Sequence, residues 1–163
     1  AEYGDGLAAP AGGGNDPPTQ NCLYRNMILK KTWWGIRIKS GEADGNAFNG
    51  TYKNITYRNI TFQDVQKGID IDVYNESVDV SKMGYSRVSD IVFEDIKGSY
   101  TVYPGHLDCS DDPPCTGLQF KDINLVNNGE GNGQWQCSYN VYGSASNVNP
   151  PLTCLNNSVA ETH

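Results

Sequence analysis

The 163-residue chain has a formal charge of -7 at pH 7, with 19 acidic and 12 basic residues. This balance argues against nucleic acid as a partner, because phosphate backbones attract Lys and Arg clustered over a broad surface. The 18 glycines and 8 prolines place turn formers throughout the chain, which predicts an all-β fold with a core of its own.

Residues 1–20 are rich in Gly and Pro and form a segment to which we assign no element. They contain neither the basic n-region nor the apolar h-region of an export signal. No stretch of the chain approaches the apolar length of a membrane span. We therefore expect no membrane segment, and we expect that any export signal has already been removed.

An imperfect repeat follows this segment. Residues 24–40, YRNMILKKTWWGIRIKS, and residues 57–73, YRNITFQDVQKGIDIDV, share Tyr-Arg-Asn and Gly-Ile-x-Ile at an offset of 33. Shorter echoes occupy residues 89–99 and 116–126, and in each one polar and apolar residues alternate as in a strand with one buried face. A motif that returns after about thirty residues, without tight turns between, predicts a right-handed parallel β-helix of about four coils. We assign these coils and a C-terminal tail to residues 21–163.

Alternate residues of the repeat face opposite sides of each strand. The inward set is predicted to be Ile36, Ile38, Ile69, Ile71 and Val73. The outward set is predicted to be Arg37, Lys39, Asp70, Asp72 and Tyr74. The offset places Arg37 beside Asp70 and Lys39 beside Asp72 as a ladder of exposed ion pairs, each worth about 0–1 kcal/mol. The alternative is a ligand clamp, since two cations about 6.5–7 Å apart on one strand face suit the carboxylate of an acidic ligand.

Five cysteines and five N-x-S/T sequons indicate a secreted glycoprotein. The sequons begin at Asn49, Asn54, Asn59, Asn75 and Asn156. His106, Cys109 and Cys115 are candidate zinc ligands, but their spacing is poor for a zinc finger and cysteines of secreted proteins usually oxidise. We therefore expect neither a metal nor another cofactor.

The segments GIRIKS, NITYRNITFQDV, IDIDVY and CSDDPPCTGLQFKDINL together resemble the C-terminal part of the polygalacturonases, the pectin-degrading β-helical enzymes of glycoside hydrolase family 28. The resemblance covers about residues 21–154. It implies that Arg37, Lys39 and Tyr74 bind a galacturonate carboxylate. It also implies that the partner is polygalacturonate or another acidic polysaccharide, met outside the cell or in a cell wall.

The resemblance implies inverting hydrolysis of α-1,4-galacturonosyl bonds. In this reaction one carboxylic acid protonates the leaving oxygen, while a carboxylate on the opposite face of the sugar activates water. The family takes these acids from an N-T-D segment and a D-D pair that precede R-I-K. This sequence has no N-T-D, and its Asp111-Asp112 pair lies far downstream. Gly4-Asp5-Gly6-Leu7 stands where the family has G-H-G-L, so that Asp5 replaces a histidine. The family's catalytic acids are therefore absent from these 163 residues.

Two interpretations of this absence stay open. In the first, the chain is the C-terminal portion of a longer enzyme, and the upstream half is its partner. In the second, it is a degenerate relative that serves as a secreted, wall-binding or structural protein. Asp70 and Asp72 are a conceivable replacement pair, since their expected separation is near the about 6.5–9.5 Å of inverting enzymes. Stacking on Arg37 and Lys39 favours two charged carboxylates, however, whereas a general acid must hold a proton.

The cysteines and tryptophans give further expectations. Cys109 and Cys115 are predicted to close a small loop through Pro113-Pro114. The resemblance implies that Cys137 and Cys154 staple the tail as a second disulfide. Cys22 is then either a buried free thiol or a bridge to an upstream segment. Trp33 and Trp34 either offer a sugar-stacking platform or cover the edge of a coil.

Overall fold

The structure, a computed structural model, describes residues 6–8, 18–39, 50–73, 86–138 and 140–157. Its strands are β1 (Leu7–Ala8), β2 (Thr19–Lys30), β3 (Trp34–Lys39), β4 (Thr51–Asp72), β5 (Arg87–Asp108), β6 (Cys115–Asn127), β7 (Gln136–Cys137) and β8 (Val141–Asn149). The described residues form no helix, and hence none long and apolar enough to cross a membrane. The predicted all-β class is confirmed.

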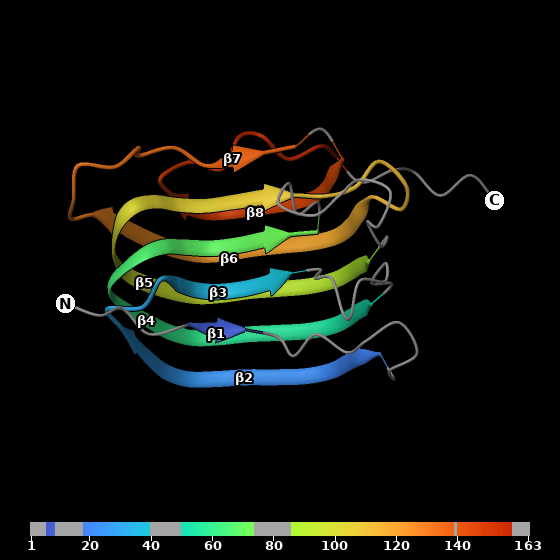
Figure 1. The fold of residues 1–163 in the computed structure, drawn as a ribbon, viewed down its shortest axis with the longest axis horizontal. Helices are drawn as coiled ribbons and strands as arrows, with labels where there is room; N and C mark the ends of the chain where they lie inside the picture. The colour runs from blue at the N-terminus through green and yellow to red at the C-terminus, as the bar shows by residue number, and fades with distance from the viewer. Residues whose placement is uncertain (1–5, 9–17, 40–49, 74–85, 139, 158–163) are drawn as a thin grey trace, which may run out of the picture.

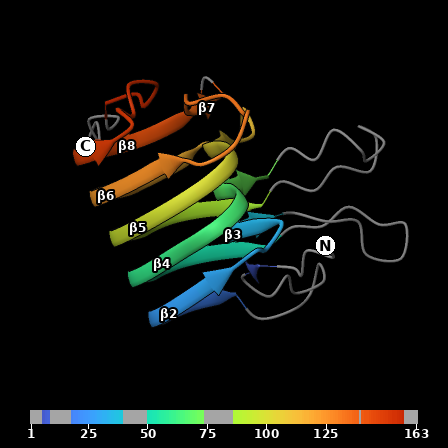
Figure 2. The ribbon, with the colours of Figure 1, turned by 90° about the vertical axis from the view of Figure 1, so that its left-hand side faces the viewer.

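Every strand pairing is parallel, and the strands wind into a β-helix whose coils lie one above another (Figure 1). β2 and β3 both pair with β4 and together make one coil. β4 and β5 each make a coil alone, and β6 with β7 makes the next, because both pair with β5. β8 continues the stack beyond β6, as the turned view in Figure 2 shows. The predicted parallel β-helix is therefore confirmed.

Each coil bends where a polar residue adopts a left-handed backbone conformation. Asn21 and Asn54 have φ near 57° and 53°, and Asn26 and Asn59 near 58° and 52°. Asn and Asp tolerate this region better than other residues with a side chain. Nδ2 of Asn54 donates to Oδ1 of Asn21, and Nδ2 of Asn59 donates to Oδ1 of Asn26, both at 2.7 Å across an offset of 33. We call these stacked corner residues the corner ladders.

The predicted inward residues of the repeat form part of the core. Ile36, Ile38, Ile69 and Ile71 are fully buried, and Val73 is 3% exposed. This is the outcome expected when alternate residues of stacked strands face a shared interior.

A column of aromatic rings continues that interior across the coils. Tyr57 stacks on Tyr24 at 5.1 Å and on Phe93 at 5.3 Å between ring centroids. Phe93 in turn stacks on Phe120 at 4.9 Å, and Trp135 closes the column in a T-shaped arrangement with Phe120. We call these rings the aromatic column. Its interior members are fully buried, whereas Tyr24 at its end is partly exposed.

Candidate functional site

Three neighbouring coils align nine side chains in register on the outside of the β-helix. Arg37 pairs with Asp70, and Asp70 with His106. The same strands align two further rows of three residues. We call the nine residues the outer strip: Trp34, Arg37 and Lys39 on β3, Lys67, Asp70 and Asp72 on β4, and Tyr103, His106 and Asp108 on β5.

Arg37 lies in the middle row of the outer strip, on β3, and holds two carboxylates. Its Nη2 donates a hydrogen bond of 2.7 Å to Oδ2 of Asp72. Its Nε lies 3.0 Å from Oδ2 of Asp70 as an ion pair, without the alignment of a hydrogen bond. The guanidinium carbon lies 3.9 Å from the centroid of the Trp34 ring, and the Arg37 side chain is only 16% exposed. The guanidinium is therefore engaged along its edge and on one face.

The predicted ladder of ion pairs is correct in register but wrong in one pairing. Lys39 is the neighbour of Asp72 in the sheet, as expected. Asp72 nevertheless pairs with Arg37 instead, because the long guanidinium side chain reaches two residues along the strand. Lys39 is exposed, and among the described residues no carboxylate lies within ion-pair distance of its Nζ. Lys39 is thus the available cation at this end of the outer strip.

Asp70 is an outward residue that its neighbours bury. It is only 3% exposed, with Arg37 on one side and Nδ1 of His106 at 3.4 Å from Oδ1 on the other. Burying a carboxylate is costly unless charged or hydrogen-bonding partners surround it. We did not predict from the sequence that His106 would be such a partner for Asp70. The alternation His106-Leu107-Asp108, which repeats Asp70-Ile71-Asp72, is the sequence signal for it.

The contact with Asp70 raises the pKa of His106 above its ordinary value. The hydrogen bond to Asp70 is the largest cause, burial opposes it, and the charges of Asp70, Asp108 and Asp72 add to the increase. A raised folded-state pKa stabilises the fold fully below the unfolded pKa of about 6.5, and this stabilisation is lost as pH rises through the folded pKa.

We therefore expect His106→Gln to lose more stability relative to wild type at mildly acidic pH than at alkaline pH. The difference should stay below about 1 kcal/mol, because the imidazole is partly exposed to solvent. Urea unfolding of both proteins near pH 5.5 and near pH 8 measures it. A wild-type advantage that is the same at both pH values would contradict the pairing.

The first row of the outer strip places a cation between two aromatic rings. Nζ of Lys67 lies 5.4 Å from the ring centroid of Trp34 and 5.5 Å from that of Tyr103. Because Arg37 also stacks on Trp34, this ring contacts protein cations. Trp33 is the more exposed tryptophan at 43%. Of the two, Trp33 is thus better placed to meet a sugar.

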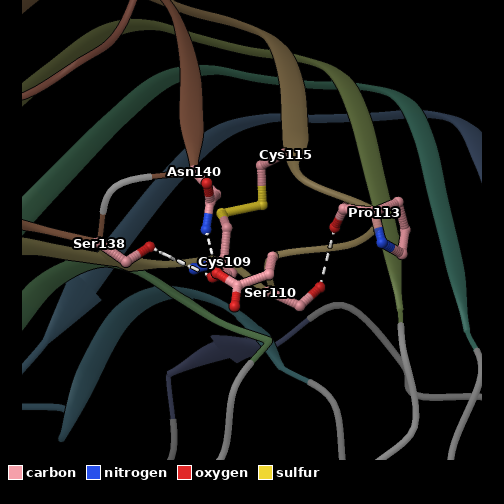
Figure 3. Close-up of a disulfide and its surroundings, with 7 residues drawn as sticks. Cys109, Ser110, Pro113, Cys115, Ser138 and Asn140 are labelled. Carbon is pink, nitrogen blue, oxygen red and sulfur yellow. Dashed lines mark hydrogen bonds between the residues drawn. A yellow bond between two sulfur atoms is a disulfide. The ribbon is translucent and has the colours of Figure 1, made fainter.

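The cysteines form the two predicted pairs, and Figure 3 shows the one between Cys109 and Cys115. Cys109 is joined to Cys115 and Cys137 to Cys154, and Cys22 is free. The Cys109 backbone N–H donates to Oγ of Ser138, which fixes the disulfide loop to the segment after β7. Disulfide sulfurs are not thiolate ligands, so the zinc interpretation is wrong for Cys109 and Cys115. No cluster of three metal-binding side chains occurs within the residues that the structure describes.

Several predicted site residues lie outside the described residues. They are the proposed subsite residue Tyr74, the substituted family position Asp5, and the sequon residues Asn49 and Asn75. Of the other sequons, Asn54 and Asn59 occupy exposed corners. Each donates one hydrogen bond through Nδ2. A glycan on Nδ2 leaves one N–H for such a bond, so glycosylation at these corners stays a prediction.

Comparison with known proteins gives a consistent relationship. The family model described as "Glycosyl hydrolases family 28" matches residues 4–147. Polygalacturonase-2 of Solanum lycopersicum is 32% identical over 157 residues, which cover 94% of this chain and 34% of that protein. Exopolygalacturonase clone GBGA483 of Arabidopsis thaliana is 33% identical over 147 residues, which cover 86% and 32%. The chain spans about a third of the length of the curated relatives it matches. With this match over most of its length, the chain belongs to family 28 of the glycosyl hydrolases.

Proposed function

We propose that the outer strip is the galacturonan-binding face of a polygalacturonase-type pectin hydrolase. The observation that supports this best is the exposed Lys39 beside Arg37 on one strand face, in a chain of family 28. A lysine ammonium without a protein carboxylate is suited to the carboxylate of a uronate. In this proposal Lys39 makes the main charged contact, Tyr74 completes the subsite, and Arg37 lines it while it holds Asp72.

The catalytic step in this proposal needs carboxylates that these 163 residues do not supply. An inverting hydrolase requires one protonated and one charged carboxylate. Asp70 and Asp72 are poorly suited to the acid role, because both contact the guanidinium of Arg37. We therefore propose that the acids belong to an upstream half of the same enzyme, which acts outside the cell on the pectin of a cell wall.

The test is a titration of oligogalacturonate and neutral oligogalactose into wild type and Lys39→Gln. We expect wild type to bind the charged sugar more tightly. Lys39→Gln should lose about fivefold in that affinity, because one exposed ion pair contributes about 1 kcal/mol. Neither protein should release reducing ends from polygalacturonate, since binding alone supplies no proton transfer. Equal affinity for charged and neutral sugars would rule out carboxylate recognition.

A second candidate is a non-catalytic β-helix that binds wall polysaccharide. It is favoured by the same engagement of Asp70 and Asp72 with Arg37, combined with the lack of an N-T-D segment in these residues. The two candidates share the binding face and differ in the rest of the protein. The mass of the natural protein after deglycosylation distinguishes them, because a value well above 17.8 kDa would favour the longer enzyme.

A further inference from the structure

Asp72 occupies the place on Arg37 that the carboxylate of a ligand would take. Its Oδ2 accepts a 2.7 Å hydrogen bond from Nη2, and its side chain is 17% exposed. Asp70, which holds the Nε edge, is buried at 3%. The two carboxylates therefore differ, since Asp70 is enclosed by protein and Asp72 reaches the surface where a ligand would approach.

A guanidinium binds a carboxylate best through two parallel N–H donors. With Nη2 donating to Asp72, Nε against Asp70 and one face over Trp34, a bidentate contact of an incoming uronate with the Nε–Nη2 edge requires that Asp72 leave. Displacing Asp72 exchanges one carboxylate for another of the same charge. The net gain for the ligand at Arg37 is therefore small.

The charge of the outer strip leads to the same conclusion. Its three permanent cations, Arg37, Lys39 and Lys67, are matched by three carboxylates, Asp70, Asp72 and Asp108. The strip therefore has at most the single positive charge of a protonated His106, and the whole chain has a formal charge of -7. A fully ionised polyuronate thus gains little general attraction from this face.

We infer that Asp72 is a specificity-determining residue that acts as an internal substitute for the ligand carboxylate on Arg37. This inference rests on the proposed binding of galacturonan. Within the described part of the outer strip, Asp72 leaves the exposed Lys39 as the main contact for a free carboxylate and removes the advantage of ionised over esterified units at Arg37. The outer strip is thereby suited to partly methyl-esterified pectic chains, in which free and esterified uronates occur in irregular order.

The test is Asp72→Asn, which keeps the shape of the side chain and removes its charge. The affinity for fully de-esterified oligogalacturonate should rise about tenfold, through a charge-assisted contact with the released Arg37. The affinity for the methyl-esterified oligosaccharide should stay unchanged. The matched control is Asp108→Asn, which removes the same charge from the neighbouring position in register with Asp72. An equal gain in both variants would assign the effect to overall charge and overturn the role of Asp72.

A spectroscopic measurement on Arg37 gives an independent readout. On addition of oligogalacturonate, the side-chain Nε–H resonance of Arg37 should shift in Asp72→Asn and stay in place in wild type. An equal shift in wild type would show that the ligand already reaches Arg37, and the inference would be wrong. If wild type binds oligogalacturonate and Asp72→Asn gains nothing, the inference fails while the proposed function stands. If no protein binds any pectic oligosaccharide, both fail.

Discussion

Replacing Arg37 by glutamine is expected to lower the free energy of unfolding by about 3 kcal/mol, because the change leaves the buried carboxylate of Asp70 without its permanent counter-charge. Asp70 is 3% exposed, and its remaining charged partner is the partly exposed His106. The same substitution also releases Asp72 and removes the contact with the Trp34 ring. Urea unfolding at neutral pH measures the loss.

The matched control is Lys39→Gln, two residues along the same strand. Lys39 is exposed and makes no ion pair with the described carboxylates, so its replacement should change stability by less than about 0.5 kcal/mol. Similar small losses in both variants would mean that Arg37 is an ordinary surface cation. The ladder of exposed ion pairs predicted from the repeat would then describe the energetics correctly.

Replacing Phe93 by alanine is expected to cost about 3–5 kcal/mol of stability, because it removes a fully enclosed ring and leaves a cavity in the aromatic column. Phe93 is fully buried and stacks on Tyr57 and Phe120 on its two faces. Both neighbours are held by their own coils, so the gap cannot close without a change in coil spacing. A lower midpoint in thermal and urea unfolding reports the effect.

Tyr24→Ala provides the comparison at the end of the same column. Tyr24 stacks on one ring and is partly exposed, so its truncation should cost about 1–2 kcal/mol, less than the loss at Phe93. The order of the two losses is the important result. A larger loss at Tyr24 would mean that the end coil, rather than the middle of the stack, limits stability.

The repeat predicted the backbone of this protein well because the register of a β-helix follows from a one-dimensional pattern. Alternation assigned Ile36 and Ile69 to the interior, and the offset of 33 paired Arg37 with Asp70, as found. Both inferences depend on where a residue stands along a strand, which the sequence contains directly.

The repeat pattern does not indicate how far a side chain extends from its position on the strand. The position of Lys39 beside Asp72 predicted an ion pair, yet the guanidinium of Arg37 extends along the strand and takes that carboxylate. The third coil introduces a second difficulty. His106 is paired with Asp70 across a coil of another length, so an offset taken from the first two coils does not find it.

The corner ladders show that coils of different length can still stack in alignment. Stacked corner partners lie 33 residues apart at Asn26 and Asn59, and 25 apart at Asp122 and Asn147, which also have left-handed backbones. The ion pair between Arg58 and Glu94, beside a corner, spans 36 residues.

Strand register shifts locally between Phe62 and Lys67 and between Cys115 and Leu118, but the strands remain paired on either side of each shift. Extra residues can therefore be accommodated between corners without displacing the rows of the outer strip. In engineering terms, a coil is an exchangeable unit, and inserting one would add one residue to each of the three rows and lengthen the strip by about 4.8 Å.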